Sequence, residues 1–82
     1  MPRLRNLSGE GVLEILRGCG FERFSQRESH VKLRRTEGGR VQTQTLTVPI
    51  HKELDRGTLQ AILRQASRFV PATELRGQFY GD

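Results

Sequence analysis

The sequence pattern predicts a β-hairpin near the centre of this chain, and the rest of the chain has to pack against it. In Ser29–Arg34, Val31 and Leu33 alternate with three basic residues, so a strand here would bury one face and expose the other. Residues Val41–Val48 return as a threonine-rich strand, which Pro49 ends. The glycine pair in Glu37–Arg40 is typical of the turn that joins two such strands.

Amphipathic helices are predicted on both sides of the hairpin. Ser8 can cap a helix over about residues 8–18, and Thr58 can cap a second helix after a loop at Ile50–Gly57. Each helix carries an apolar stripe at helical spacing: Val12, Leu13, Leu16 and Cys19 in the first, and Leu59, Ile62, Leu63 and Ala66 in the second. Residues Phe21–Gln26 are predicted to form a short strand, although their alternation is poor.

The predicted order is helix, three strands, helix. This order indicates an α+β fold with a three-stranded antiparallel sheet and two helices on one face. A chain of 82 residues is too short for two cores, so residues 1–82 are expected to form a single domain. Its core is expected to span about residues 7–75, followed by a flexible tail at residues 77–82.

The chain is strongly basic. Fourteen Lys and Arg residues against nine Asp and Glu residues give a net charge of +5, and all the cations except Lys32 and Lys52 are arginine. Arginine makes planar, two-pronged contacts with phosphate, so a polyanionic partner is one hypothesis; a basic surface that only aids solubility is the other. The single cysteine, the lack of a signal peptide and the lack of an apolar span favour a cytoplasmic location.

Several kinds of site are disfavoured by the residues present. One cysteine and two well-separated histidines do not have the spacing of a structural zinc site, and no metal is expected. Gly38–Gly39 lies between two strands, so it does not resemble a phosphate-binding loop and no small-molecule cofactor is expected. Ser29 and His30 are adjacent on a strand, so their side chains face opposite ways and His30 cannot readily activate Ser29.

RNA cleavage remains chemically feasible, because RNA supplies its own nucleophile. The 2′-hydroxyl attacks the adjacent phosphate, so the protein has only to move protons and stabilise charge. An imidazole with an ordinary pKa of about 6.5 can do the first at neutral pH. His30 is the candidate for this role, and Lys32 and Arg34 on the same strand face could stabilise the phosphate.

The sequence also resembles the HicA (YcfA-like) mRNA-interferase toxins of bacterial toxin–antitoxin pairs, from about Leu7 to Leu75. The segments that carry the resemblance are Ser8–Val12, Gly20–Phe21, Gln26–His30, Thr47–His51, Lys52–Leu54 and Gly57–Ala66. The resemblance implies a fold like that of a double-stranded-RNA-binding domain, α-β-β-β-α. It implies an endoribonuclease that cleaves mRNA, and a HicB antitoxin that covers the active site.

The resemblance also assigns residues to the site. His30 matches the family's catalytic histidine and Ser29 the serine before it, in a Gly-Ser-His motif. Glu28 replaces the glycine of that motif; its carboxylate could repel phosphate or could orient the imidazole. His51 matches a histidine after the family's Val-Pro pair, which could bind substrate, act as a second proton carrier or simply pack in its loop. Ser29, Lys32, Arg34 and His51 are therefore candidate substrate-binding residues.

Two other functions remain open from the sequence. The same fold could bind RNA without cutting it, with Glu28 as the sign of a lost activity. Alternatively, the basic face could dock an acidic protein partner, with RNA playing no part. A cleavage assay without metal separates the first alternative from an enzyme, and the salt dependence of RNA binding separates the second.

Overall fold

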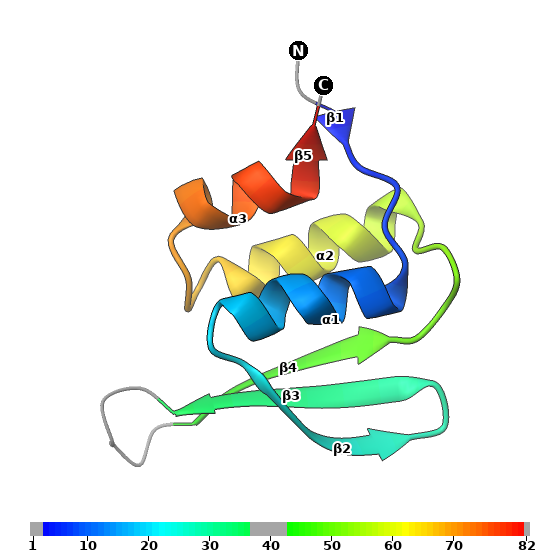
Figure 1. Ribbon diagram of the computed structural model, residues 1–82, viewed down its shortest axis with the longest axis vertical. Coiled ribbons are helices and arrows are strands. Elements are labelled where there is room, and N and C mark those ends of the chain that lie inside the picture. Colours follow the sequence, from blue (N-terminus) through cyan, green and yellow to red (C-terminus); the bar gives the residue numbers. More distant parts are fainter. Residues whose placement is uncertain (1–2, 37–42, 82) are drawn as a thin grey trace.

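A three-stranded antiparallel sheet lies on one side of the molecule, and helices cover one face of this sheet (Figure 1). The computed structural model describes residues 3–36 and 43–81. The elements follow in the order β1 (Arg3–Leu4), α1 (Gly9–Gly18), β2 (Glu22–Arg27), β3 (His30–Thr36), β4 (Thr43–Pro49), α2 (Arg56–Ala66), α3 (Ala72–Phe79) and β5 (Tyr80–Gly81).

The sheet has the strand order β2-β3-β4, with β3 in the middle. Val31 pairs with Val48 and Leu33 with Leu46, and all four side chains are buried beneath the helices. The predicted alternation is therefore confirmed: apolar residues of β3 and β4 point inward, and the basic residues and threonines between them are exposed. The predicted turn at Glu37–Arg40 lies outside the described residues, as do residues 41 and 42.

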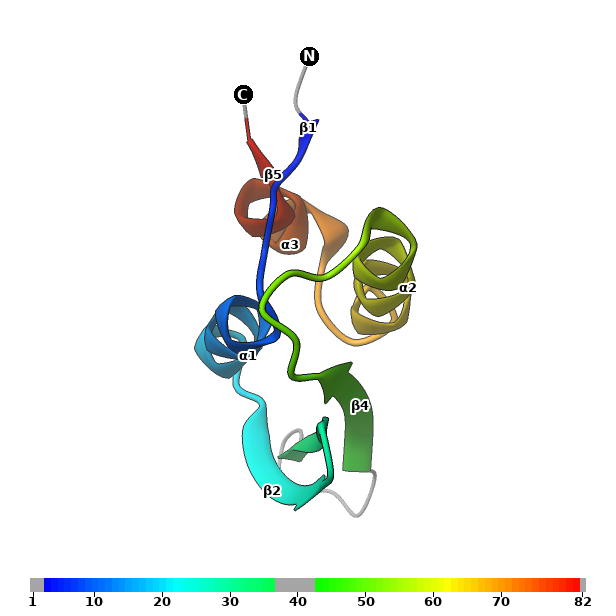
Figure 2. The same cartoon turned by 90° about the vertical axis from the view of Figure 1, so that its right-hand side faces the viewer.

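Helices α1 and α2 lie side by side on the inner face of the sheet (Figure 2). The Ser8 hydroxyl accepts a hydrogen bond from the Gly11 amide at 3.0 Å, which confirms Ser8 as the cap of α1. The predicted cap of the second helix is wrong. α2 begins at Arg56, and the Asp55 carboxylate accepts from the Thr58 amide at 3.1 Å. An ionised carboxylate is a strong cap, so the helix starts three residues before Thr58 would allow.

The chain beyond Gly77 differs from the expected flexible tail. Gly77–Phe79 completes α3, and β5 pairs with β1, which brings the two ends of the chain together. α3 lies beyond α1 and α2, on their side away from the sheet (Figure 2). Leu75 and Phe79 of α3 are fully buried in the core, and this burial holds the segment in place. Two helices do cover the sheet, and α3 forms a further layer.

The predicted fold class is confirmed: the protein is α+β, with a sheet and helix arrangement consistent with that of a double-stranded-RNA-binding domain. A single cluster of apolar residues runs from the sheet through α1 and α2 to α3. None of the helices in the described residues is long and apolar enough to span a membrane.

Candidate active site

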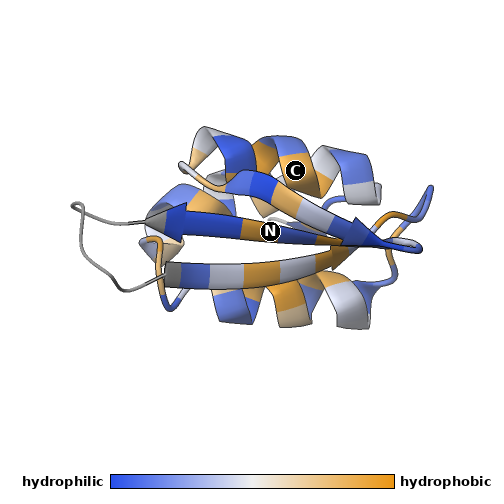
Figure 3. Cartoon of the chain, turned by 90° about the horizontal axis from the view of Figure 1, so that it is seen from below, coloured by the Kyte–Doolittle hydropathy of each residue, from blue (hydrophilic) through white to orange (hydrophobic). Residues whose placement is uncertain are grey.

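The outer face of the sheet, which the helices leave uncovered, gathers the basic side chains of β2 and β3. Figure 3 views this face from below, with polar and apolar residues alternating along the strands. Cross-strand partners point to the same side of a sheet. Arg27 of β2 pairs with His30, and Ser25 pairs with Lys32, so all four side chains share the outer face. Thr47 and Pro49 of β4 flank them.

His30 lies in an open hollow at one end of this face. The hollow is lined by Ser25, Arg27, Glu28, His30 and Lys32, which come from β2, from β3 and from the turn between them. All five residues are exposed. The predicted pair of His30 and Lys32 is therefore brought together. Arg27 is an addition that sequence reasoning missed, although counting back across the hairpin from His30 would have found it.

The tight turn between β2 and β3 fixes the position of His30. Glu28 and Ser29 form this turn, and Glu28 has a φ of 56°. Such a φ is unfavourable for residues with a side chain, whereas glycine adopts it freely. The Gln26 side-chain amide donates to the Glu28 carbonyl oxygen at 3.2 Å. Among the described residues, no hydrogen bond joins the Glu28 carboxylate to the His30 imidazole.

Ser29 is half-buried and does not line the hollow. Its carbonyl oxygen accepts a hydrogen bond from the Ile50 amide at 2.6 Å, which ties the turn to the end of β4. Gly9, at the start of α1, packs against the same segment. A Cβ atom on Gly9 would overlap the Pro49 carbonyl oxygen, so only glycine allows this close approach. Ser29 thus contributes to the site through its backbone.

Arg34 lies farther along β3 than His30 and Lys32 and does not line the hollow. Its guanidinium carbon is 4.8 Å from the centre of the Phe24 ring. Phe24 sits at a bulge in β2, because the pairing with β3 shifts between Arg23 and Ser25. Phe24 could not be singled out from the sequence, because β2 lacks a regular alternation.

His51 is exposed in the loop after β4 and lies outside the hollow. Its carbonyl oxygen accepts from the Gly9 amide at 2.9 Å. Its imidazole lies near Asp55, the cap of α2. The pKa of the Asp55 carboxyl is lowered mainly by the hydrogen bonds from Thr58 and additionally by the charge of His51. The structure therefore places His51 beside the start of α2 and outside the hollow that holds His30.

Arg35, the neighbour of Arg34, has a structural position on the inner face. Its guanidinium donates to the Cys19 carbonyl oxygen at 3.0 Å and to the Phe69 carbonyl oxygen at 2.7 Å. It also donates to the Gln44 side chain at 2.8 Å and lies 5.2 Å from the centre of the Phe21 ring. The period of two along a strand thus separates two adjacent arginines. Arg34 faces solvent, and Arg35 binds the segments that follow α1 and α2.

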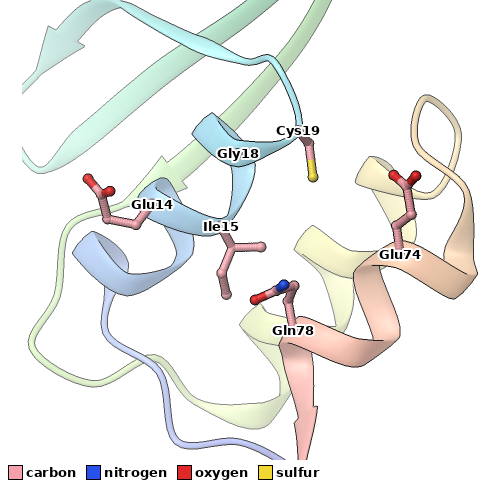
Figure 4. A pocket seen from close by; sticks show the side chains of 6 residues that line it. All are labelled: Glu14, Ile15, Gly18, Cys19, Glu74 and Gln78. Carbon is pink, nitrogen blue, oxygen red and sulfur yellow. The ribbon is translucent and has the colours of Figure 1, made fainter.

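A second hollow lies between α1 and α3, with Ile15 and Cys19 on one side and Glu74 and Gln78 on the other (Figure 4). Partial burial raises the pKa of the Cys19 thiol, and the nearby Glu74 carboxylate raises it further, against a smaller opposite effect of Arg35. Both main effects disfavour the thiolate, which is the reactive form of cysteine. Cys19 therefore packs between the helices, as expected.

The outer face combines the imidazole of His30 with two neighbouring cationic side chains. The imidazole can exchange a proton. Arg27 on the neighbouring strand and Lys32 on the same strand can contact a phosphate beside it. Among residues 3–36 and 43–81, no group of three or more His, Cys, Asp or Glu side chains is placed to hold a metal ion.

A family model matches most of the chain. The family model described as the HicA toxin of bacterial toxin–antitoxin matches residues 9–67, which span α1, the whole sheet and α2. No curated protein and no solved structure matches the chain. The matched region includes every residue of the hollow, and it ends before α3.

Proposed function

The chain belongs to the HicA toxin family of bacterial toxin–antitoxin systems, and we propose that it acts as an endoribonuclease that cleaves RNA through His30 without a metal ion. The observation that carries this proposal is the hollow on the outer sheet face. It combines one imidazole with Arg27 and Lys32, on a face open enough to receive a polymer.

The reaction needs little from the protein beyond these groups. The 2′-hydroxyl loses its proton, its oxygen bonds to the adjacent phosphorus, and the bond from phosphorus to the 5′-oxygen breaks. The 5′-oxygen then takes up a proton, so the products are a 2′,3′-cyclic phosphate and a 5′-hydroxyl. His30 carries one of these two protons, since an imidazole accepts and releases protons near neutral pH.

Arg27 and Lys32 are assigned to the phosphate. Charge builds up on its non-bridging oxygens as the new bond forms, and cations aimed at those oxygens stabilise the transition state more than the ground state. Both side chains line the hollow with His30. Arg34, farther along the strand, is assigned to the RNA away from the reacting phosphate. Glu28 works against phosphate binding, because its carboxylate shares the hollow.

A toxin of this class acts with an antitoxin partner. We assign mRNA as the substrate, which would place its action in the cytoplasm, and a HicB-like protein as the antitoxin. The outer sheet face is the surface such a partner would need to cover. Its exposed cations favour a partner with acidic residues at the contact, because unpaired charges of one sign in an interface are costly.

The test is the cleavage of a long single-stranded RNA by the purified protein in the presence of EDTA. We expect fragments that end in a 2′,3′-cyclic phosphate and begin with a 5′-hydroxyl. The matched control is the same sequence with 2′-O-methyl groups, which removes the nucleophile and is expected to remain intact. Cleavage of the methylated strand would contradict the mechanism.

The alternative is a non-catalytic RNA-binding module, and the presence of Glu28 beside His30 favours it. In that case the protein would shift RNA in a gel, and the RNA would stay intact under every condition tested. Restoring the family's glycine with Glu28→Gly would then be the variant to assay next.

A further inference from the structure

Phe24 is the one large apolar side chain that the described residues expose, with 43% of its surface accessible. This ring is not part of the hydrophobic core, whereas the rings of Phe21 and Phe79 are almost completely buried in it. A single exposed apolar residue is common on protein surfaces and needs no explanation by itself. Phe24 differs because its surroundings fix both its direction and its neighbour.

The bulge in β2 turns the Phe24 ring toward the outer face. Arg23 pairs with Leu33 and Ser25 with Lys32, which leaves Phe24 without a partner on β3. Its ring lies under the Arg34 guanidinium, at 4.8 Å from the ring centre. Arg34 belongs to the same outward row as Lys32 and His30. Bulges often redirect a side chain beside an active site, and this one adds a flat ring to the cationic face.

A ring and a guanidinium on a cationic sheet face suit an unpaired base. Bases of single-stranded RNA stack on aromatic rings and on arginine planes, whereas paired bases in a duplex are not available for this. Arg34 lies four positions after His30, which corresponds to about 13 Å along the strand. A base at Phe24 would therefore belong to a nucleotide a few positions away from a phosphate at His30.

We propose that Phe24, together with Arg34, is a stacking site for an unpaired base, and that the protein therefore acts on single-stranded regions of RNA. This inference rests on the proposed function, because it takes the outer face as the RNA-binding surface. A protein partner fits Phe24 less well. The ring is isolated among charged and polar side chains, whereas protein-binding sites usually present a continuous apolar patch.

The test measures binding of RNA by variants that also carry His30→Ala, so that the strand stays intact. The probe is a short, unstructured, fluorescently labelled RNA in EDTA, read by anisotropy. Phe24→Leu keeps an apolar side chain but removes the stacking surface, and should weaken binding about tenfold. Phe24→Tyr keeps the ring and should bind like the parent. Arg68→Gln, which removes a charge on the helical side, should change affinity by less than Phe24→Leu.

Two further probes distinguish stacking from other effects. A strand of the same length with abasic sites offers phosphates without bases, and its affinity should be the same for Phe24→Leu and for the parent. An RNA duplex should likewise show no dependence on Phe24. Thermal melts check that Phe24→Leu is folded. If it were not, stacking would still be tested by comparing the affinity of Phe24→Tyr for the intact strand with its affinity for the abasic strand.

Unchanged affinity of Phe24→Leu for single-stranded RNA would overturn the inference. So would an equal loss of affinity for the abasic strand, or a loss of binding to the antitoxin with RNA binding intact. Cleavage by the protein with His30 restored is measured in parallel. If it cuts no RNA while the Phe24 effect on binding is present, the proposed catalysis fails and the stacking site stands.

Discussion

Glu28 occupies a backbone conformation that costs a residue with a side chain about 1 kcal/mol or more. It also places a carboxylate in the hollow that holds His30. We expect Glu28→Gly to raise the free energy of unfolding by roughly 0.5 kcal/mol, since glycine relieves the strain but adds freedom to the unfolded chain. We also expect faster RNA cleavage at low RNA concentration, because a negative charge near the phosphate is removed.

Glu28→Gln separates the two effects. It removes the charge and keeps the side chain, so it should increase cleavage without increasing stability. Urea unfolding and initial cleavage rates measure both properties. A Glu28→Gly protein that is less stable than the wild type would show that the turn does not need the left-handed conformation.

Arg34 and Arg35 should respond very differently to the same conservative change. Arg35→Lys cannot reproduce the three hydrogen bonds to Cys19, Gln44 and Phe69, and should lower the free energy of unfolding by about 2–3 kcal/mol. Arg34→Lys should change stability by less than about 0.5 kcal/mol, because the side chain is exposed. Equal effects in urea unfolding would contradict this division between the two faces of β3.

At the scale of the elements, the start of α2 depends on an ionised cap. The pKa of Asp55 is lowered, chiefly because its carboxylate accepts hydrogen bonds from Thr58. A lowered pKa in the folded protein means that the stabilisation is fully present above the unfolded pKa, about 3.9, and is lost as the pH falls through the folded value. Asp55→Ala should lower Tm by on the order of 5 °C at pH 7.

Asp55→Asn is the matched variant, since an amide oxygen still caps the helix but does not titrate. The difference in Tm between the wild type and Asp55→Ala should shrink below pH 4, whereas the difference between Asp55→Asn and Asp55→Ala should persist. Thermal melts between pH 3 and pH 7 provide the comparison. A difference between wild type and Asp55→Ala that stays constant with pH would rule out an ionised cap.

Two glycines should respond to alanine with opposite signs. Gly77 lies within α3 with no neighbour near its Cβ position, so Gly77→Ala should stabilise the protein by about 0.5–1 kcal/mol. At Gly9 a Cβ atom would overlap the Pro49 carbonyl oxygen, so Gly9→Ala should destabilise by about 1–3 kcal/mol. Urea unfolding measures both. Destabilisation by Gly77→Ala would contradict the helix at this position.

At the scale of the whole molecule, the sequence was sufficient to predict the elements that carry a regular pattern. The alternation in β3 and the apolar stripes of α1 and α2 each repeat over several residues, and these parts of the fold were correct. The last residues of α3 were predicted to belong to a flexible tail, because Leu75 and Phe79 offer a single apolar spacing with Gly77 between them. Such a helix forms because it packs on α1 and α2, which no local pattern records.

The residues of the candidate site could likewise be predicted only where a regular pattern places them. His30 and Lys32 follow from the period of two along one strand, and both line the hollow. Arg27 follows from the two-residue turn that pairs it with His30, but this pairing was missed. The position of Phe24 depends on the bulge in β2, which the sequence of the strand does not reveal. His51 looked like a site residue only through the family resemblance. In the fold its loop turns toward the start of α2, so its role in substrate binding stays a prediction.

The most direct test of the proposed function compares RNA cleavage by the wild type and His30→Ala, with EDTA present and RNA saturating. His30→Ala should cut at least about 100-fold more slowly while melting at the wild-type temperature, because the side chain is exposed and works in proton transfer. His51→Ala, which removes the other histidine, should keep its rate at saturating RNA. Cleavage by His30→Ala at the wild-type rate would contradict the assignment of His30 as the catalytic residue.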